Sequence, residues 1–230
     1  MYADWLEEQK DFARAEFIRV QIEGEAIRQA RSGDWLTLLN RSEKILRRNS
    51  AKWLGRLHGS LRHRIYRRGF LEEASLLATT LLNNSEAFFR LGPVTAIYLR
   101  GGMGHLNELS LLPGFARLKL LQLEGNYWTG ASQFGTFMHS EAVSNLEWLD
   151  LRGNNIGREG VDSLAASPRL LRLATLRLDQ CQLSDEALWA LAVTPNLPAL
   201  KTVYLSGNTV DFRRRGARAL RERLGEGLLV

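Results

Sequence analysis

The strongest constraint in this 230-residue sequence is a nine-residue pattern, L-x-x-L-x-L-x-x-N/C, that recurs in its second part with Val, Ile or Gly at some positions. The matching segments in register are 94–102, 118–126, 146–154, 173–181 and 200–208. Their last residues, Gly102, Asn126, Asn154, Cys181 and Asn208, follow at intervals of 24, 28, 27 and 27 residues. A fixed period of about 20 to 50 residues is typical of solenoids, in which each unit buries its apolar face against its neighbour. The pattern therefore excludes an ordinary globular arrangement for this part.

Each segment has the alternation of a short strand. Alternate strand residues point to opposite faces, so Leu149 and Leu151 should point into the core, and Trp148, Asp150 and Arg152 should point out. The intervals leave room for a helix in each unit, and they resemble the ribonuclease-inhibitor-like class of leucine-rich repeats. That resemblance implies an α/β leucine-rich repeat solenoid of about five repeats, with parallel strands on the concave face and helices on the convex face.

The segments between the strands support this organisation. Residues 155–168 and 182–195 carry apolar residues at helical spacing and end in Pro168 and Pro195. Ser184 is the predicted N-cap of the second helix. Residues 211–227 predict a C-terminal capping helix. Cys181 takes the place of the repeat asparagine, so we expect a buried, inert thiol.

The first part has a different periodicity. Apolar residues predict one helix with Leu6, Phe17, Ile18 and Ile22, a second with Leu36, Leu39 and Leu46, and a third with Trp53, Leu54, Leu57, Leu61 and Ile65. Ser32-Gly33-Asp34 breaks the pattern, with Asp34 as a predicted N-cap. Residues 65–76 are strand-like and predict an extra strand on the open edge of the repeat sheet. Residues 77–92 predict a helix. We therefore divide the chain into a helical region, 1–63, and a solenoid, 64–230.

Residues 2–21, YADWLEEQKDFARAEFIRVQ, resemble the repeat-companion domain, a short N-terminal module that precedes tandem repeats in some bacterial proteins. The similarity continues through 53–57, 67–73 and 88–94, so that with the repeats it covers nearly the whole chain. Membership of this family implies that the domain accompanies tandem repeats, and it implies no activity for the domain itself. Its members have another helix before this segment, so the resemblance implies a misassigned start site or a shortened first helix.

Charge is concentrated in one segment. Residues 1–40 carry a net charge of −3, residues 41–69 carry +9, and residues 70–230 balance. Two interpretations of the basic segment stand: a solvated helix face, or a surface that binds the phosphates of nucleic acid or an acidic partner.

Little in the sequence indicates catalysis. His58, His63, His105 and His139 lack metal-ligand spacing, and the glycines of 100–106 fit a repeat turn better than a phosphate loop. We therefore expect no enzyme activity, cofactor or metal. One cysteine and the lack of a long apolar stretch favour a cytoplasmic protein that does not enter a membrane.

The outward strand residues predict a binding surface. Leu120 and Trp148 fall on adjacent strands beside Tyr98, a composition typical of protein-binding hot spots; the alternative is that other side chains cover them. Charges on neighbouring strands predict cross-strand ion pairs, such as Asp150 with Arg177. We predict a monomeric scaffold that binds a protein partner on the concave face, with nucleic-acid binding as the alternative. The predicted partner-binding residues are Tyr98, Arg100, Leu120, Gln122, Glu124, Trp148, Asp150, Arg152, Arg177, Asp179 and Tyr204.

Overall fold

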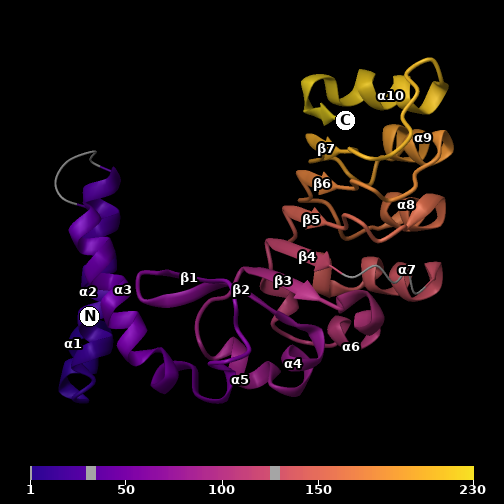
Figure 1. Ribbon diagram of the computed structural model, residues 1–230. Helices are drawn as coiled ribbons and strands as arrows, with labels where there is room; N and C mark the ends of the chain where they lie inside the picture. Colours follow the sequence, from indigo (N-terminus) through magenta and orange to yellow (C-terminus); the bar gives the residue numbers. More distant parts are fainter. Residues whose placement is uncertain (1, 30–34, 125–129) are drawn as a thin grey trace. The chain divides into compact units, whose positions relative to one another are not determined.

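The computed structural model describes residues 2–29, 35–124 and 130–230 (Figure 1). The chain forms two compact units: the first contains residues 1–74 and 86–94, and the second contains 75–85 and 95–230. The predicted division into 1–63 and 64–230 stays a prediction. Among the described residues, no helix is both long and apolar enough to cross a membrane.

Three helices form much of the first unit: α1 (Tyr2–Glu8), α2 (Phe12–Gln29) and α3 (Trp35–Leu54), which a 3-10 turn, Gly55–Leu57, follows. The predicted first helix is wrong in its continuity, because the chain turns at Lys10, where φ is 63°. Conversely, the second predicted helix and the start of the third are continuous as α3, which ends at Leu54. The rest of the predicted third helix is wrong, because Leu61 lies in a loop and Ile65 lies in the strand Arg64–Arg67. The predicted break at 32–34, with its N-cap Asp34, lies outside the described residues.

Residues on which the repeat-companion resemblance rests contact one another. The ring centroid of Phe17 lies 5.2 Å from that of Trp53 and 5.6 Å from that of Tyr66. Gln21 accepts a hydrogen bond from the backbone N of Gly69 at 2.7 Å, and its amide donates to Ser42 at 3.3 Å. These contacts join α2 to α3 and to the strands that follow. The family resemblance itself stays a prediction.

The segment predicted as one edge strand is a hairpin. Strands β1 (Arg64–Arg67) and β2 (Phe70–Leu77) pair antiparallel. The chain reverses at Arg68 and Gly69, where φ is 49° and 83°. The strand order places β2 beside β3, at the edge that the sequence predicts. The helix predicted over 77–92 is divided into α4 (Ala78–Asn83) and α5 (Ser85–Phe89).

The repeat strands of the second unit form a parallel sheet, which confirms the α/β solenoid. They are β3 (Ala96–Arg100), β4 (Leu120–Glu124), β5 (Trp148–Asp150), β6 (Thr175–Arg177) and β7 (Thr202–Tyr204). One further strand, β8 (Leu228–Leu229), pairs with β7 and was not predicted. The register aligns Leu121, Leu149, Leu176 and Val203, all fully buried.

Helices cover one face of this sheet (Figure 1). They are α6 (Leu106–Ser110), α7 (Ala131–His139), α8 (Gly157–Ala166), α9 (Asp185–Val193) and α10 (Arg215–Leu224). Short 3-10 turns lie at Gly102–His105, Phe115–Arg117, Glu141–Val143 and Gly225–Gly227. Ser184 caps α9 as predicted, since its side chain accepts from the backbone N of Ala187.

The repeat asparagines satisfy backbone groups between neighbouring units. The Asn208 amide donates to the carbonyls of Leu178 and Leu205 at 2.7 and 2.9 Å, and its oxygen accepts from the backbone N of Cys181 and Leu183 at 3.0 and 3.2 Å. One side chain therefore pairs four main-chain groups. Asn154 similarly donates to the carbonyls of Leu123 and Leu151, at 2.8 Å each. Asn126 lies outside the described residues.

Cys181 is buried, as predicted, and burial raises the pKa of its thiol to about 11. The thiolate is the reactive form, so at pH 8 only about one thiol in a thousand would be reactive. We expect iodoacetamide to label the native protein at least about a hundredfold more slowly than the urea-unfolded chain, with the rate increasing as pH rises toward 11. Intact-mass spectrometry measures this, and equal native and unfolded rates would contradict it.

The predicted capping helix is α10, and two charged side chains attach it to the preceding repeat. The Asp185 carboxylate accepts hydrogen bonds from the backbone N of Gly216 and Ala217, each at 2.9 Å. At the other end of α10, the Arg223 guanidinium donates to the carbonyls of Thr194 and Leu197 at 3.0 and 2.6 Å. The basic C-terminal segment therefore has a structural role.

Candidate functional site

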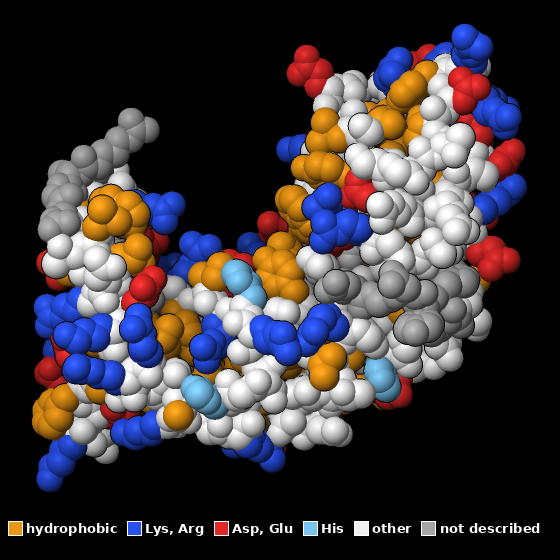
Figure 2. All heavy atoms as spheres, viewed as in Figure 1, with side chains coloured by type: hydrophobic (Ala, Val, Ile, Leu, Met, Phe, Trp, Pro, Cys, Tyr) orange, Lys and Arg blue, Asp and Glu red, His pale blue; other side chains and the backbone are white. Residues whose placement is uncertain are grey.

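The strand face is the set of side chains that point away from the helices on β3 to β7. Parallel register aligns them in columns, as the sequence predicts. One column contains Ala96, Leu120, Trp148, Thr175 and Thr202, and the next contains Tyr98, Gln122, Asp150, Arg177 and Tyr204. Arg100 pairs with Glu124 in register, but the side chain of Glu124 lies outside the described part of the structure. Figure 2 shows hydrophobic side chains along the strand side of the second unit.

Three predicted residues form a cluster across β5, β6 and β7. The ring centroids of Trp148 and Tyr204 lie 6.3 Å apart. Arg177, on the strand between them, places its guanidinium carbon 4.8 Å from the centroid of the Tyr204 ring. All three side chains are only partly buried. The cluster therefore combines aromatic surface with a positive charge, and it stays accessible.

The acidic residues of this face are buried and bonded to the backbone. Asp179 is 5% exposed; it lies 3.1 Å from the Nε of Arg177 and accepts from the backbone N of Ser206 at 3.1 Å. Asp150 is 4% exposed; it accepts from the backbone N of Arg152 at 3.0 Å and pairs with that guanidinium at 3.5 Å. The predicted cross-strand ion pairs are therefore wrong for these carboxylates, although Asp150 and Arg177 are register partners. Each arginine instead reaches the carboxylate two residues away on its own repeat.

The remaining predicted residues surround the cluster. Arg152 is exposed, and Tyr98, Arg100, Leu120 and Gln122 are partly buried. Arg100 has no carboxylate partner among residues whose side chains the structure describes. The face therefore presents several arginines, while its two described carboxylates, Asp150 and Asp179, are buried and accept hydrogen bonds from the backbone.

Sequence reasoning missed Leu229, which extends the same surface. Leu229 pairs with Tyr204 in parallel register and is 40% exposed. Its signal was a short apolar stretch at the end of the chain, which does not fit the nine-residue pattern. The backbone at Gly227, just before β8, lies close to the backbone at Lys201. A Cβ on Gly227 would lie 1.9 Å from the carbonyl oxygen of Lys201.

The basic segment 41–69 is partly neutralised by acidic residues of the first unit. Arg41 pairs with Glu16 at 2.7 Å, Lys52 with Asp11 at 3.8 Å, and Arg68 with Glu25 at 3.7 Å. The cations that stay exposed without a carboxylate partner within the described ranges are Lys44, Arg47, Arg48, Arg56 and Arg62. Compensation favours the interpretation as a solvated helix face, and nucleic-acid binding stays a prediction.

The histidines are part of no metal-binding group in the described part of the chain. Within residues 2–29, 35–124 and 130–230, no group of three or more His, Cys, Asp or Glu side chains is arranged to hold a metal ion. The glycines near residue 101 lie in a turn, as the alternative to a phosphate loop predicts: Gly101 has a φ of 71° and leads into a 3-10 turn.

Comparisons with known proteins identify the repeat. Residues 144–165, which include β5 and most of α8, match the family model described as Leucine Rich repeat. A chain in the crystal structure of the Rad7 and Elc1 complex in yeast is similar to this one, with 20% identity and a TM-score of 0.39, over 57% of this chain and 33% of that chain. The comparison with curated proteins finds no match. The matched segment is one unit of the parallel sheet, and the fold is that of a leucine-rich repeat solenoid, an architecture that typically mediates protein–protein interaction.

Proposed function

We propose that the chain is a non-enzymatic scaffold that binds a protein partner on the strand face, centred on Trp148, Arg177 and Tyr204. The observation that carries this proposal is the Trp–Arg–Tyr cluster on three adjacent strands. Trp, Tyr and Arg are the residues most enriched among interface hot spots, where they contribute most of the binding energy.

The arginine of the cluster is held in place before any partner arrives. Its Nε is 3.1 Å from the carboxylate of Asp179, which the backbone N of Ser206 fixes in turn. A side chain that is already ordered loses less entropy on binding, which increases affinity. The three residues lie on β5, β6 and β7. Each of these strands pairs with a strand on both sides, which holds it rigidly.

The charge of the face indicates the chemistry of its partner. Arg152 and Arg177 are paired with the buried carboxylates of Asp150 and Asp179, and Arg100 adds a positive charge that no described carboxylate balances. A partner segment that combines apolar or aromatic side chains with carboxylates fits this surface, because complementary charge increases the association rate and excludes wrong partners.

The test is capture of a partner from native host lysate by immobilised protein. We expect Trp148→Ala combined with Arg177→Ala to abolish capture and leave the circular dichroism spectrum unchanged. Undiminished capture by this variant would refute the strand face as the site.

The helix side offers a matched control. Arg215 stacks on Trp189, with its guanidinium carbon 3.5 Å from the ring centroid. Trp189→Ala combined with Arg215→Ala removes the same two residue types from outside the strand face. This variant should retain capture, and its loss of capture would show that the first result reflects general destabilisation.

A further inference from the structure

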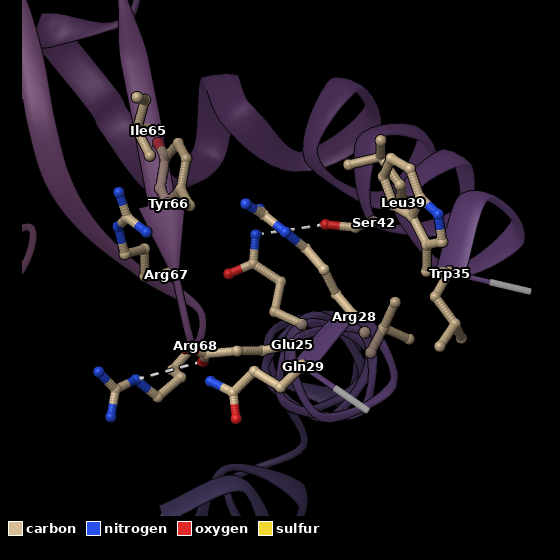
Figure 3. Close-up of a pocket in the computed structure, with 14 residues that line it drawn as sticks. Glu25, Arg28, Gln29, Trp35, Leu39, Ser42, Ile65, Tyr66, Arg67 and Arg68 are labelled. Atoms are coloured by element: carbon tan, nitrogen blue, oxygen red, sulfur yellow. Dashed lines mark hydrogen bonds and ion pairs between the residues drawn. The ribbon is translucent and has the colours of Figure 1, made fainter. Parts of the chain in front are cut away.

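The first unit contains a pocket of about 560 Å³ that no sequence motif indicated. It lies between α2, α3 and β1 (Figure 3). Its walls include Arg28 from α2, Trp35, Leu39 and Ser42 from α3, and Tyr66 from β1. Pockets that bind small molecules have volumes of about 300 to 1,000 Å³, so this pocket has the size for a small ligand.

The polar groups of the pocket are mainly hydrogen-bond donors. Figure 3 shows the side chain of Arg28 extending from α2 into the space between Tyr66 and Ser42. Arg28 has no carboxylate partner among the described residues. At the rim, Arg67 pairs with Glu72 at 3.3 Å, and Arg68 lies 3.7 Å from Glu25. Arg28 is therefore the cation of this pocket whose charge is not matched by a nearby carboxylate.

A buried hydroxyl group on α3 adds to the donors. Ser42 is 7% exposed, and its oxygen accepts from the Gln21 amide at 3.3 Å, while its own hydrogen has no acceptor among the described residues. Tyr66 is 9% exposed and lines the pocket, while Figure 3 shows its oxygen on the side of Ile65, away from Arg28. The Gln21 oxygen is already occupied by the backbone N of Gly69. An excess of donors together with an unmatched positive charge favours an anionic ligand.

The opposite wall is apolar. Trp35 is 42% exposed and Leu39 is 43% exposed, so a large part of each side chain is available for contact. An indole face beside an aliphatic side chain accommodates a planar ring, while a guanidinium binds phosphate or carboxylate oxygens. We propose that this pocket binds a small organic anion of mononucleotide size, with its ring against Trp35 and its anionic group on Arg28.

Isothermal titration of the full chain tests the proposal, with adenosine 5′-monophosphate as the probe. We expect saturable binding that Arg28→Gln weakens at least tenfold and that Trp35→Ala also weakens. Inorganic phosphate and adenosine, which each carry half of the proposed recognition, should bind at least tenfold more weakly than the probe.

A matched control is Arg47→Gln, which removes an exposed arginine of α3 that does not line the pocket; it should bind like the wild type. No saturable binding of the monophosphate at millimolar concentration would overturn the proposal. Equal affinity of wild type and Arg28→Gln, or equal affinity for phosphate and the monophosphate, would also overturn it. An acidic peptide that protects Trp35 where the monophosphate does not would assign the pocket to a protein segment instead.

Discussion

Replacing Asn208 with alanine should lower the free energy of unfolding of the repeat unit by about 3 to 5 kcal/mol. The substitution leaves four main-chain groups without their partner: the N–H groups of Cys181 and Leu183 and the carbonyls of Leu178 and Leu205. Each buried group that loses its partner costs about 1 to 3 kcal/mol, and partial access of water to the bend reduces the total. Few single substitutions on this chain remove so many backbone hydrogen bonds.

Urea unfolding followed by far-ultraviolet circular dichroism measures this loss. Asn107→Ala is the control, because Asn107 is exposed on α6 and its side chain has no described hydrogen bond; it should change stability by less than about 0.5 kcal/mol. Similar unfolding midpoints for the two variants would show that the asparagine bonds contribute little to the stability of the repeats.

The repeat part of the fold could be predicted because its information is local. One nine-residue pattern specifies a strand and a bend, and repetition specifies how units stack, so Leu149 and Leu176 fall into register without knowledge of the rest of the chain. β8 could not be found in this way. It is positioned by the close approach of Gly227 to Lys201, which is a tertiary contact.

The helical part was less predictable for the converse reason. The ends of its helices depend on contacts between distant residues. A left-handed Lys10 separates α1 from α2, and the hairpin turn at Gly69 packs on Ile18, which is far from it in sequence. Apolar spacing alone gives helical segments and does not show where the chain turns.

The outward residues of the strand face followed from the two-residue alternation of strands, but their ion pairs did not. Cross-strand distance suggested that Asp150 would meet Arg177. The arginine side chain instead turns back to Asp179, whose other oxygen accepts from the next repeat. The pocket on Arg28 could not be predicted, because α2, α3 and β1 bring its walls together from separate segments.

Gly69→Ala should lower the stability of the first unit by about 3 kcal/mol. Gly69 has a φ of 83°, and a Cβ placed there would lie 2.1 Å from the Cγ1 of Ile18. A left-handed alanine costs about 1 to 2 kcal/mol, and excess volume in a packed core typically costs about 1 to 3 kcal/mol more. Movement of the turn away from Ile18 would also break the hydrogen bond from the Gly69 N–H to the side-chain oxygen of Gln21. Hydrogen exchange measured by mass spectrometry should show faster exchange in α2 and the hairpin, with β5 to β7 unchanged.

Gly59→Ala is the matched control for this prediction, since a Cβ on Gly59 would meet no atom within 4 Å and its φ is not positive. It should exchange like the wild type. Shortening the opposing side chain separates the two causes of the loss: Ile18→Ala removes the atom that clashes and leaves the left-handed backbone. The loss of stability in the combined variant should therefore be smaller than the sum of the two single losses, by about 1 to 2 kcal/mol. If the two losses simply add, the clash with Ile18 is not what destabilises the hairpin, and strain at the turn accounts for the effect.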